Sequence, residues 1–188
     1  MIVVISGTNR PGSNTRVVAK QCFEQLNRIS NEKIVFLDLL EINVHLLTDD
    51  MFTIEGQNKT IAKIQDEILI PAHHWVVISP EYNGSFPGIL KILIDAASTR
   101  KYKETFEGKK VSLIGTSSGR AGNFRGMEHL TGIFNYLNML VFPNKLPISS
   151  IESLMVSEDE VNDETKELIH EFSKELMVFN SLKYESNK

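Results

Sequence analysis

The chain alternates between two patterns of hydrophobic and polar residues. Short runs of consecutive apolar residues are followed by longer segments in which apolar residues recur at every third or fourth position. The first pattern is typical of strands buried on both faces, and the second is typical of helices. The runs predict strands at residues 2–6, 33–39, 75–79, 110–115 and 141–148. The spacing predicts helices at residues 14–29, 60–70, 88–99, 123–140 and 161–179.

Two of these elements carry a more detailed expectation. Pro143 and Pro147 lie in the fifth strand, which we therefore expect to be irregular or at an edge, because proline cannot donate a ladder hydrogen bond. The last helix is expected to turn one stripe of residues toward the core, namely Val161, Thr165, Leu168, Phe172 and Phe179.

The order of the elements predicts a parallel sheet. Strands and helices alternate along the chain, and the first, third and fourth strands are almost wholly apolar. Such strands are covered by helices on both faces, as in a doubly wound α/β fold. No repeat, linker or low-complexity tract interrupts the pattern, so residues 1–188 are expected to form a single domain. Ligands of these folds bind outside the carboxyl ends of the strands, which are followed here by three loops of unusual composition.

Composition and charge narrow the choice of partners. The 188 residues are 41% hydrophobic and 23% charged, as in ordinary globular proteins. The net charge of −4 argues against nucleic-acid binding, and it falls short of the acidity expected of a small electron carrier. No apolar run is long enough to span a membrane, and the N-terminus lacks a signal-peptide pattern. We therefore expect a cytoplasmic protein.

Cysteine and histidine give no sign of a metal centre. The single cysteine, Cys22, excludes an internal disulfide and is expected to pack inside the first helix. His73 and His74 precede the third strand and are expected at the surface, without carboxylates or cysteines at ligand spacing. No metal site is predicted.

The loop after the first strand has the composition of a phosphate site. Residues 7–15 read GTNRPGSNT and lead directly into the first predicted helix. The N–H groups and the dipole of a helix N-terminus attract an anion. Hydroxyl and amide side chains donate further hydrogen bonds, and Arg10 supplies positive charge. This set suits a terminal phosphate monoester.

Three other readings of this loop stay open to different degrees. A nucleoside-triphosphate loop needs Lys-Ser/Thr after its second glycine, where Ser13 and Asn14 stand here. The dinucleotide fingerprint G-x-G-x-x-G is absent, although Asp38 ends the second strand where a ribose-binding acid would lie. The loop could also be a plain turn in which Ser or Asn caps the helix.

The loop after the third strand suits a flat heterocycle. Residues 80–88 read PEYNGSFPG, and the pair Asn83-Gly84 is a tight-turn signal because both residues tolerate positive φ. Backbone N–H and C=O groups of this turn can pair with the polar edge of a flavin ring, while Tyr82 or Phe86 covers apolar surface. The alternative is that Tyr82 and Phe86 simply plug the core.

Together the two loops resemble the NADPH-dependent FMN reductase family, which includes chromate, quinone and azo-dye reductases. The first loop is similar to the family pattern G-[ST]-x-R-x-x-S-x-x. The second is similar to P-E-Y-N-x-S-x-P-x-x-L-K-x-x-I-D, which runs here from Pro80 through Lys91 to Asp95. The resemblance covers about residues 2–135. It implies a flavodoxin-like three-layer sandwich with a five-stranded parallel sheet in the order 2-1-3-4-5, and FMN bound by these loops.

The resemblance also implies roles for individual residues. The positions that match its phosphate-binding residues are Thr8, Arg10, Ser13, Asn14 and Thr15. The positions that match its flavin-ring residues are Pro80, Glu81, Tyr82, Asn83 and Gly84. The loop after the fourth strand, TSSGRAGN, resembles its third flavin-contacting loop and adds Ser117 and Gly119.

Other residues bear on the donor and the acceptor. Ala96 follows Asp95 where many relatives have an aromatic residue, and Asn9 replaces a hydrophobic residue, so the substrate-side pocket departs from the family pattern. Arg120 and Arg125 either hold the phosphate of a nicotinamide cofactor or are simply solvated.

The helix predicted at 88–99 indicates self-association. It is apolar nearly all round, and only Lys91 and Asp95, which are i,i+4 partners, interrupt its apolar surface. A helix of this kind is buried on all sides, so its outer face is expected to meet another subunit. A homodimer, or a homotetramer built from it, is predicted.

The predicted reaction transfers hydride from NADPH or NADH through bound FMN to a small acceptor such as a quinone, an azo compound, free flavin or a metal oxyanion. No Ser-His-Asp or Cys-His grouping stands out, so no catalytic acid or nucleophile is named. Two alternatives stay open: a flavodoxin-type electron carrier without catalysis, and a nucleotide-sensing domain without turnover.

Overall fold

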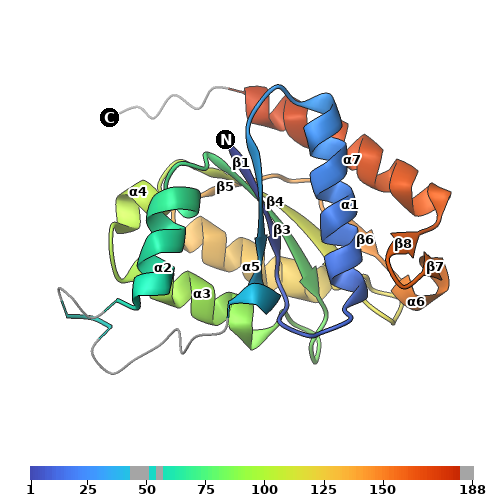
Figure 1. The fold of residues 1–188 in the computed structure, drawn as a ribbon, viewed down its shortest axis with the longest axis horizontal. Coiled ribbons are helices and arrows are strands. Elements are labelled where there is room, and N and C mark those ends of the chain that lie inside the picture. Colours follow the sequence, from blue (N-terminus) through green and yellow to red (C-terminus); the bar gives the residue numbers. More distant parts are fainter. Residues whose placement is uncertain (43–50, 54–56, 183–188) are drawn as a thin grey trace.

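A parallel sheet forms the centre of the molecule in the computed structural model, which describes residues 1–42, 51–53 and 57–182 (Figure 1). Its strands lie in the order β2-β1-β3-β4-β5, which confirms the predicted flavodoxin-like order. The four full strands are β1 (Ile2–Ser6), β2 (Ile34–Asp38), β3 (His74–Pro80) and β4 (Lys110–Thr116). All pair in parallel register, so their carboxyl ends meet at one edge.

The fifth position in the sheet is irregular, as the prolines predict. Two short pieces, β5 (Leu140–Val141) and β6 (Leu146–Ile148), both pair with β4. Pro143 lies in the break between them, and Pro147 lies inside β6, which has β4 as its one neighbour in the described sheet. A proline is tolerated in such an edge strand because its missing N–H faces away from the ladder.

Helices cover both faces of the sheet. The helices α1 (Asn14–Ile29) and α7 (Asp163–Ser181) pack on one face, as Figure 1 shows. The other face is covered by α2 (Lys59–Ile64), continued by the π turn η2 (Gln65–Leu69), and by α3 (Gly88–Ser98), α4 (Tyr102–Phe106) and α5 (Phe124–Tyr136). The remaining short elements are η1 (Leu39–Glu41), α6 (Ile151–Leu154) and the hairpin of β7 (Met155–Ser157) and β8 (Glu160–Val161).

The apolar strands divide their side chains between two cores. In β1, Val3 and Ile5 pack under α2, α3 and α5, while Ile2 and Val4 pack under α1 and α7. Successive side chains of a strand point to opposite faces, so a run with no polar member is needed to fill both cores. This geometry explains the consecutive apolar runs from which the parallel sheet was predicted.

Three details of the predicted elements are wrong. The helix predicted at 123–140 ends at Tyr136, and the chain from Leu140 already belongs to the sheet. The last helix begins at Asp163, after Asn162 accepts a capping hydrogen bond from Thr165 N–H at 2.9 Å. Leu168, predicted to face inward, is half exposed. The buried stripe of α7 instead follows Thr165, Ile169, Phe172, Ser173 and Leu176.

His74 is buried, which contradicts its predicted surface position. It is the first residue of β3 and its side chain is fully covered. Its ring nitrogens lie 2.8 Å from the Ser112 hydroxyl and 3.1 Å from Asn180 Oδ1. Those two polar partners, distant in sequence, are what make its burial possible. Burial lowers the pKa of His74 to about 3. His73, by contrast, is exposed as predicted.

Within the described ranges, no helix combines the length and the apolarity that crossing a membrane requires.

Candidate functional site

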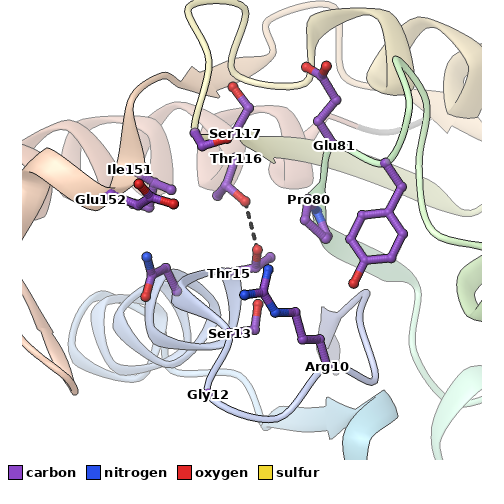
Figure 2. A pocket seen from close by; sticks show the side chains of 13 residues that line it. Arg10, Gly12, Ser13, Thr15, Pro80, Glu81, Thr116, Ser117, Ile151 and Glu152 are labelled. Atoms are coloured by element: carbon purple, nitrogen blue, oxygen red, sulfur yellow. Dashed lines mark hydrogen bonds between the residues drawn. The ribbon is translucent and has the colours of Figure 1, made fainter.

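The loops after β1, β3 and β4 meet in one cleft at the carboxyl edge of the sheet (Figure 2). The cleft has a volume of about 210 Å³ and is open to solvent. Its lining from these three loops is Arg10, Gly12, Ser13, Asn14, Thr15, Pro80, Glu81, Tyr82, Thr116, Ser117 and Ser118. Residues separated by a hundred positions thus face one space, because parallel strands end together.

The N-terminus of α1 leaves donors free for an anion. Ser13 occupies the capping position of this helix, yet its hydroxyl makes no capping hydrogen bond. The side chains of Arg10 and Asn14 likewise have no hydrogen-bond partner among the described residues. The first turn contains no acidic residue. Unpaired donors, one cation and a helix N-terminus on one wall suit a phosphate group.

The two threonines of this loop are engaged within the protein. Thr8 is buried, and its hydroxyl accepts a hydrogen bond from the Arg10 N–H at 3.2 Å. The Thr15 hydroxyl lies 2.7 Å from the Thr116 hydroxyl at the end of β4, as the dashed line in Figure 2 marks. Thr8 therefore shapes the loop, whereas Thr15 ties α1 to the end of β4 and also lines the cleft.

Asp38 is not available to bind a ribose. It is buried at the end of β2, forms an ion pair with Arg16 of α1, and accepts a hydrogen bond from the Leu40 N–H at 3.1 Å. Arg16 also reaches Glu41 at 3.2 Å. Asp38, which left a dinucleotide-binding site as an alternative in the sequence analysis, therefore anchors α1 to β2.

The loop after β3 forms a tight hairpin turn. Tyr82 and Ser85 exchange two backbone hydrogen bonds of 2.8 and 3.0 Å around Asn83 and Gly84, both of which have positive φ (53° and 75°). This is a type I′ turn, as the Asn-Gly pair predicts. The N–H groups of Asn83 and Gly84 have no backbone partner among the described residues, so the tip presents two free donors, but neither residue is part of the cleft lining.

Pro80 and Tyr82 contribute surface on which a ring can lie. Pro80 and Tyr82 line the cleft, and Tyr82 is 38% exposed, although it is a large aromatic residue. It therefore does not plug the core, which was one of the two interpretations of its position. Phe86 is partly buried and packs against the core, so the plug interpretation holds for that residue. The Glu81 side chain lines the same rim (Figure 2).

The loop after β4 closes the cleft from a third side. Ser117 lines the cleft, and its hydroxyl donates to the Gly119 carbonyl and accepts from the Gly122 N–H, both at 2.9 Å. Gly119 is exposed and lies outside the lining, so it supports the loop rather than facing the cleft. Arg120 and Arg125 are exposed and also lie outside the lining.

A fourth wall of the site was missed in the sequence. Ile151 and Glu152, at the start of α6, line the cleft opposite the α1 N-terminus (Figure 2). This wall is held to the β4 loop by hydrogen bonds from Ile151 N–H to the Ser117 carbonyl (3.0 Å) and from Ser150 N–H to the Gly119 carbonyl (2.9 Å). The preceding residues form an irregular edge strand, and α6 has a single turn, so no hydrophobic period marks this segment.

Taken together, the donor set fits FMN. The phosphate would lie against Arg10, Ser13 and Asn14, where unpaired donors meet the helix N-terminus. The polar edge of the ring would meet the free N–H groups of the turn tip. The cleft thus offers charge and hydroxyls at one wall and the aromatic side chain of Tyr82 at another, and the turn that follows Tyr82 adds backbone donors just beyond the lining.

Comparison with known proteins agrees with this geometry. Residues 1–152 match the model of the family described as NADPH-dependent FMN reductase. The chain belongs to the NADPH-dependent FMN reductase family. It is therefore an enzyme of the NAD(P)H-dependent FMN reductase and quinone reductase type.

Three relatives illustrate the range of this family. The NADPH azoreductase of Bacillus sp. (strain OY1-2) is 27% identical over 190 residues, which cover 100% of this chain and 96% of that protein. The 2-hydroxy-1,4-benzoquinone reductase of Burkholderia sp is 33% identical over 81 residues, 43% of this chain and 44% of that protein. The fold matches that of the flavoenzyme FerB from Paracoccus denitrificans with a TM-score of 0.74, at 20% identity and 94% coverage of each chain.

Proposed function

We propose that this chain is an FMN-dependent NAD(P)H oxidoreductase that reduces a small acceptor such as a quinone, an azo compound, free flavin or a metal oxyanion. The observation that carries the proposal is one cleft in which hydrogen-bond donors suited to a phosphate face residues on which a ring can lie. Arg10 and Ser13 offer side-chain donors without a partner among the described residues, and Pro80 and Tyr82, from the loop after β3, line the same cleft.

The residues of the cleft would bind and orient, and they would exclude water from one side. When bound, FMN supplies the two-electron chemistry that connects a reduced nicotinamide to the acceptor. With a quinone the balance is NAD(P)H plus one proton plus quinone, giving NAD(P)⁺ plus hydroquinone. We assign this proton to solvent, to which the cleft is open.

The donor and the acceptor are proposed from the surroundings of the cleft and from the relatives. Arg120 and Arg125 are exposed beside the β4 loop, where they can meet the phosphates of NADPH or NADH. The names of the relatives, an azoreductase and a benzoquinone reductase, favour flat conjugated acceptors.

We further propose that residues 1–188 act as a single FMN-binding domain and associate as a homodimer, or as a homotetramer built from it. An open groove lies between α3, α4 and α5, lined by Ile94, Ile133 and Leu137 and flanked by the Lys91–Asp95 ion pair (2.6 Å). Tyr136 at its edge is 81% exposed. An exposed aromatic beside an apolar groove is typical of a surface that another subunit covers.

Steady-state kinetics test the proposed activity. With FMN present, we expect the protein to oxidise NADPH or NADH in the presence of a benzoquinone, with parallel double-reciprocal plots when both substrates are varied. Parallel plots indicate that the first product leaves before the acceptor binds. Binding of FMN without turnover of either nicotinamide would instead assign the chain to the electron carriers, and failure to bind flavin would overturn the site.

A further inference from the structure

Asn123 connects the loop after β4 to the end of β3. It lies immediately before α5, is fully buried and has a positive φ of 59°. Its side-chain Nδ2 donates to the backbone carbonyls of Ser79 (3.0 Å) and Pro80 (2.8 Å). These carbonyls belong to the last residues of β3, directly ahead of the turn at 82–85.

The peptide between Pro80 and Glu81 is held at both of its polar atoms. Asn123 donates to its carbonyl oxygen at 2.8 Å, and its N–H donates to the Thr116 carbonyl at 2.9 Å. Regular pairing between β3 and β4 ends at the pair Pro80 and Thr116. Asn123 therefore extends the attachment of β3 to the β4–α5 unit by one peptide, up to the residues that line the cleft.

The surroundings of Asn123 are shaped to admit its side chain. Gly126 lies one turn away on α5, and a Cβ there would overlap Asn123 Oδ1. That oxygen is buried and has no hydrogen-bond partner, so every side-chain hydrogen bond of Asn123 within the described structure is directed at the end of β3.

We propose that Asn123 is a positioning residue that fixes the end of β3 and the start of the turn at 82–85, and thereby Pro80 and Tyr82, which line the cleft beside the proposed flavin ring. This inference rests on the proposed FMN site. It assigns to Asn123 no contact with the flavin, since Asn123 lies outside the cleft lining.

The variant Asn123→Gly tests the proposal, because glycine keeps the positive φ and removes only the side chain. The matched control is Asn138→Gly, which makes the same change at an exposed residue with nearly the same φ, 61°. The dissociation constants of FMN and of riboflavin are measured by quenching of flavin fluorescence. The visible absorption band of bound FMN and the thermal midpoint of each variant are recorded in parallel.

We expect Asn123→Gly to lower the affinities for FMN and riboflavin by the same factor, about five- to tenfold. The reason is that contacts to the ring are disturbed, while Arg10 and Ser13, the residues proposed to bind the phosphate, are unchanged. The absorption band of bound FMN shifts toward that of free FMN, and Asn138→Gly changes none of these values. If Asn123→Gly lowers the thermal midpoint but leaves both dissociation constants and the band unchanged, the residue is structural and the proposal is overturned. Wild-type protein that binds neither flavin would overturn the FMN site itself, a distinguishable failure.

A second pair of variants covers the case in which Asn123→Gly does not fold. Asn123→Asp keeps the size of the side chain and tolerates the positive φ but replaces the donating Nδ2 with an oxygen, whereas Asn138→Asp makes the same change at an exposed residue with nearly the same φ. The proposal requires Asn123→Asp to weaken the binding of both flavins and Asn138→Asp to leave it unchanged. Equal affinities in the two variants would contradict it.

Discussion

His74, the buried histidine of β3, shows that hydrogen bonds to residues distant in sequence allow a polar side chain to be buried. His74 follows an exposed histidine in sequence, and its two partners come from β4 and α7. The sequence predicts where β3 begins to within one residue, but it contains no local signal that distinguishes His74 from His73. Burial of a polar ring depends on groups far along the chain, so it is visible in the fold alone.

Stability should depend on pH through His74. Its pKa is lowered to about 3 in the folded protein, whereas an unfolded histidine titrates near 6.5. Below pH 6.5 the unfolded chain therefore binds a proton that the folded chain does not. This contribution destabilises the fold by about 2 kcal/mol between pH 7 and pH 5.

Urea unfolding of wild type and of His74→Gln at pH 7 and pH 5 checks this prediction. The variant should lose about 2 kcal/mol less than wild type over this interval. His170→Gln, at a half-buried position on α7, controls for loss of a histidine as such. Identical losses in wild type and His74→Gln would show that another group dominates acid unfolding.

Arg10 and Ser13, the residues proposed to bind the phosphate of FMN, give a second prediction for single residues. Ser13→Ala should weaken FMN about five- to tenfold, and Arg10→Ala about 10- to 100-fold because its bond is charge-assisted. Riboflavin, which lacks the phosphate, should bind both variants as it binds wild type. Fluorescence titrations with the two flavins measure this difference. If the variants lost as much affinity for riboflavin as for FMN, Arg10 and Ser13 would not be the residues that bind the phosphate.

At the scale of elements, the turn at 82–85 was predictable and the fourth wall was not. Asn-Gly between a strand and a helix signals positive φ at both positions, and the type I′ turn follows from local chemistry. The segment with α6 has no comparable signal, because one helical turn and a three-residue edge strand contain too few residues for a period. Short elements held by tertiary hydrogen bonds escape pattern analysis for this reason.

The variant Gly84→Ala tests the role of that turn. Its φ of 75° places the added methyl group in a conformation that costs about 1 kcal/mol or more for other residues. Gly108→Ala is a matched control, with a φ of 72° and equally open space around it. Both variants should lose similar unfolding free energy in urea, but only Gly84→Ala should weaken FMN. Equal FMN affinity in the two variants would separate the turn from the flavin site.

For the whole molecule, the arrangement of a sheet between two layers of helices could be predicted from the sequence. Consecutive apolar strands separated by helical periods leave few arrangements other than a parallel sheet between two helix layers. The strand order came from the family resemblance, since several orders satisfy the same pattern. The groove between α3, α4 and α5 depends on side chains from three helices, so only its α3 wall was predictable.

A charged residue introduced at the edge of this groove tests whether the subunits associate through it. Tyr136→Lys places a cation at the edge of the apolar groove, and the lysine also suits the end of α5 because it complements the helix dipole. We expect sedimentation to show a dimer or tetramer for wild type and a monomer for this variant. Val156→Lys, at an exposed position of β7, should leave the assembly unchanged. A wild-type monomer at micromolar concentration would refute the proposal.

An anaerobic titration of the FMN complex with NADPH, and then with NADH, followed by visible absorption, distinguishes a reductase from an electron carrier. The account predicts that FMN binds with a flavin spectrum, that one equivalent of a nicotinamide bleaches it, and that a benzoquinone restores it. Bound FMN that neither nicotinamide bleaches would contradict the account, since a cleft that holds the flavin without passing hydride belongs to an electron carrier.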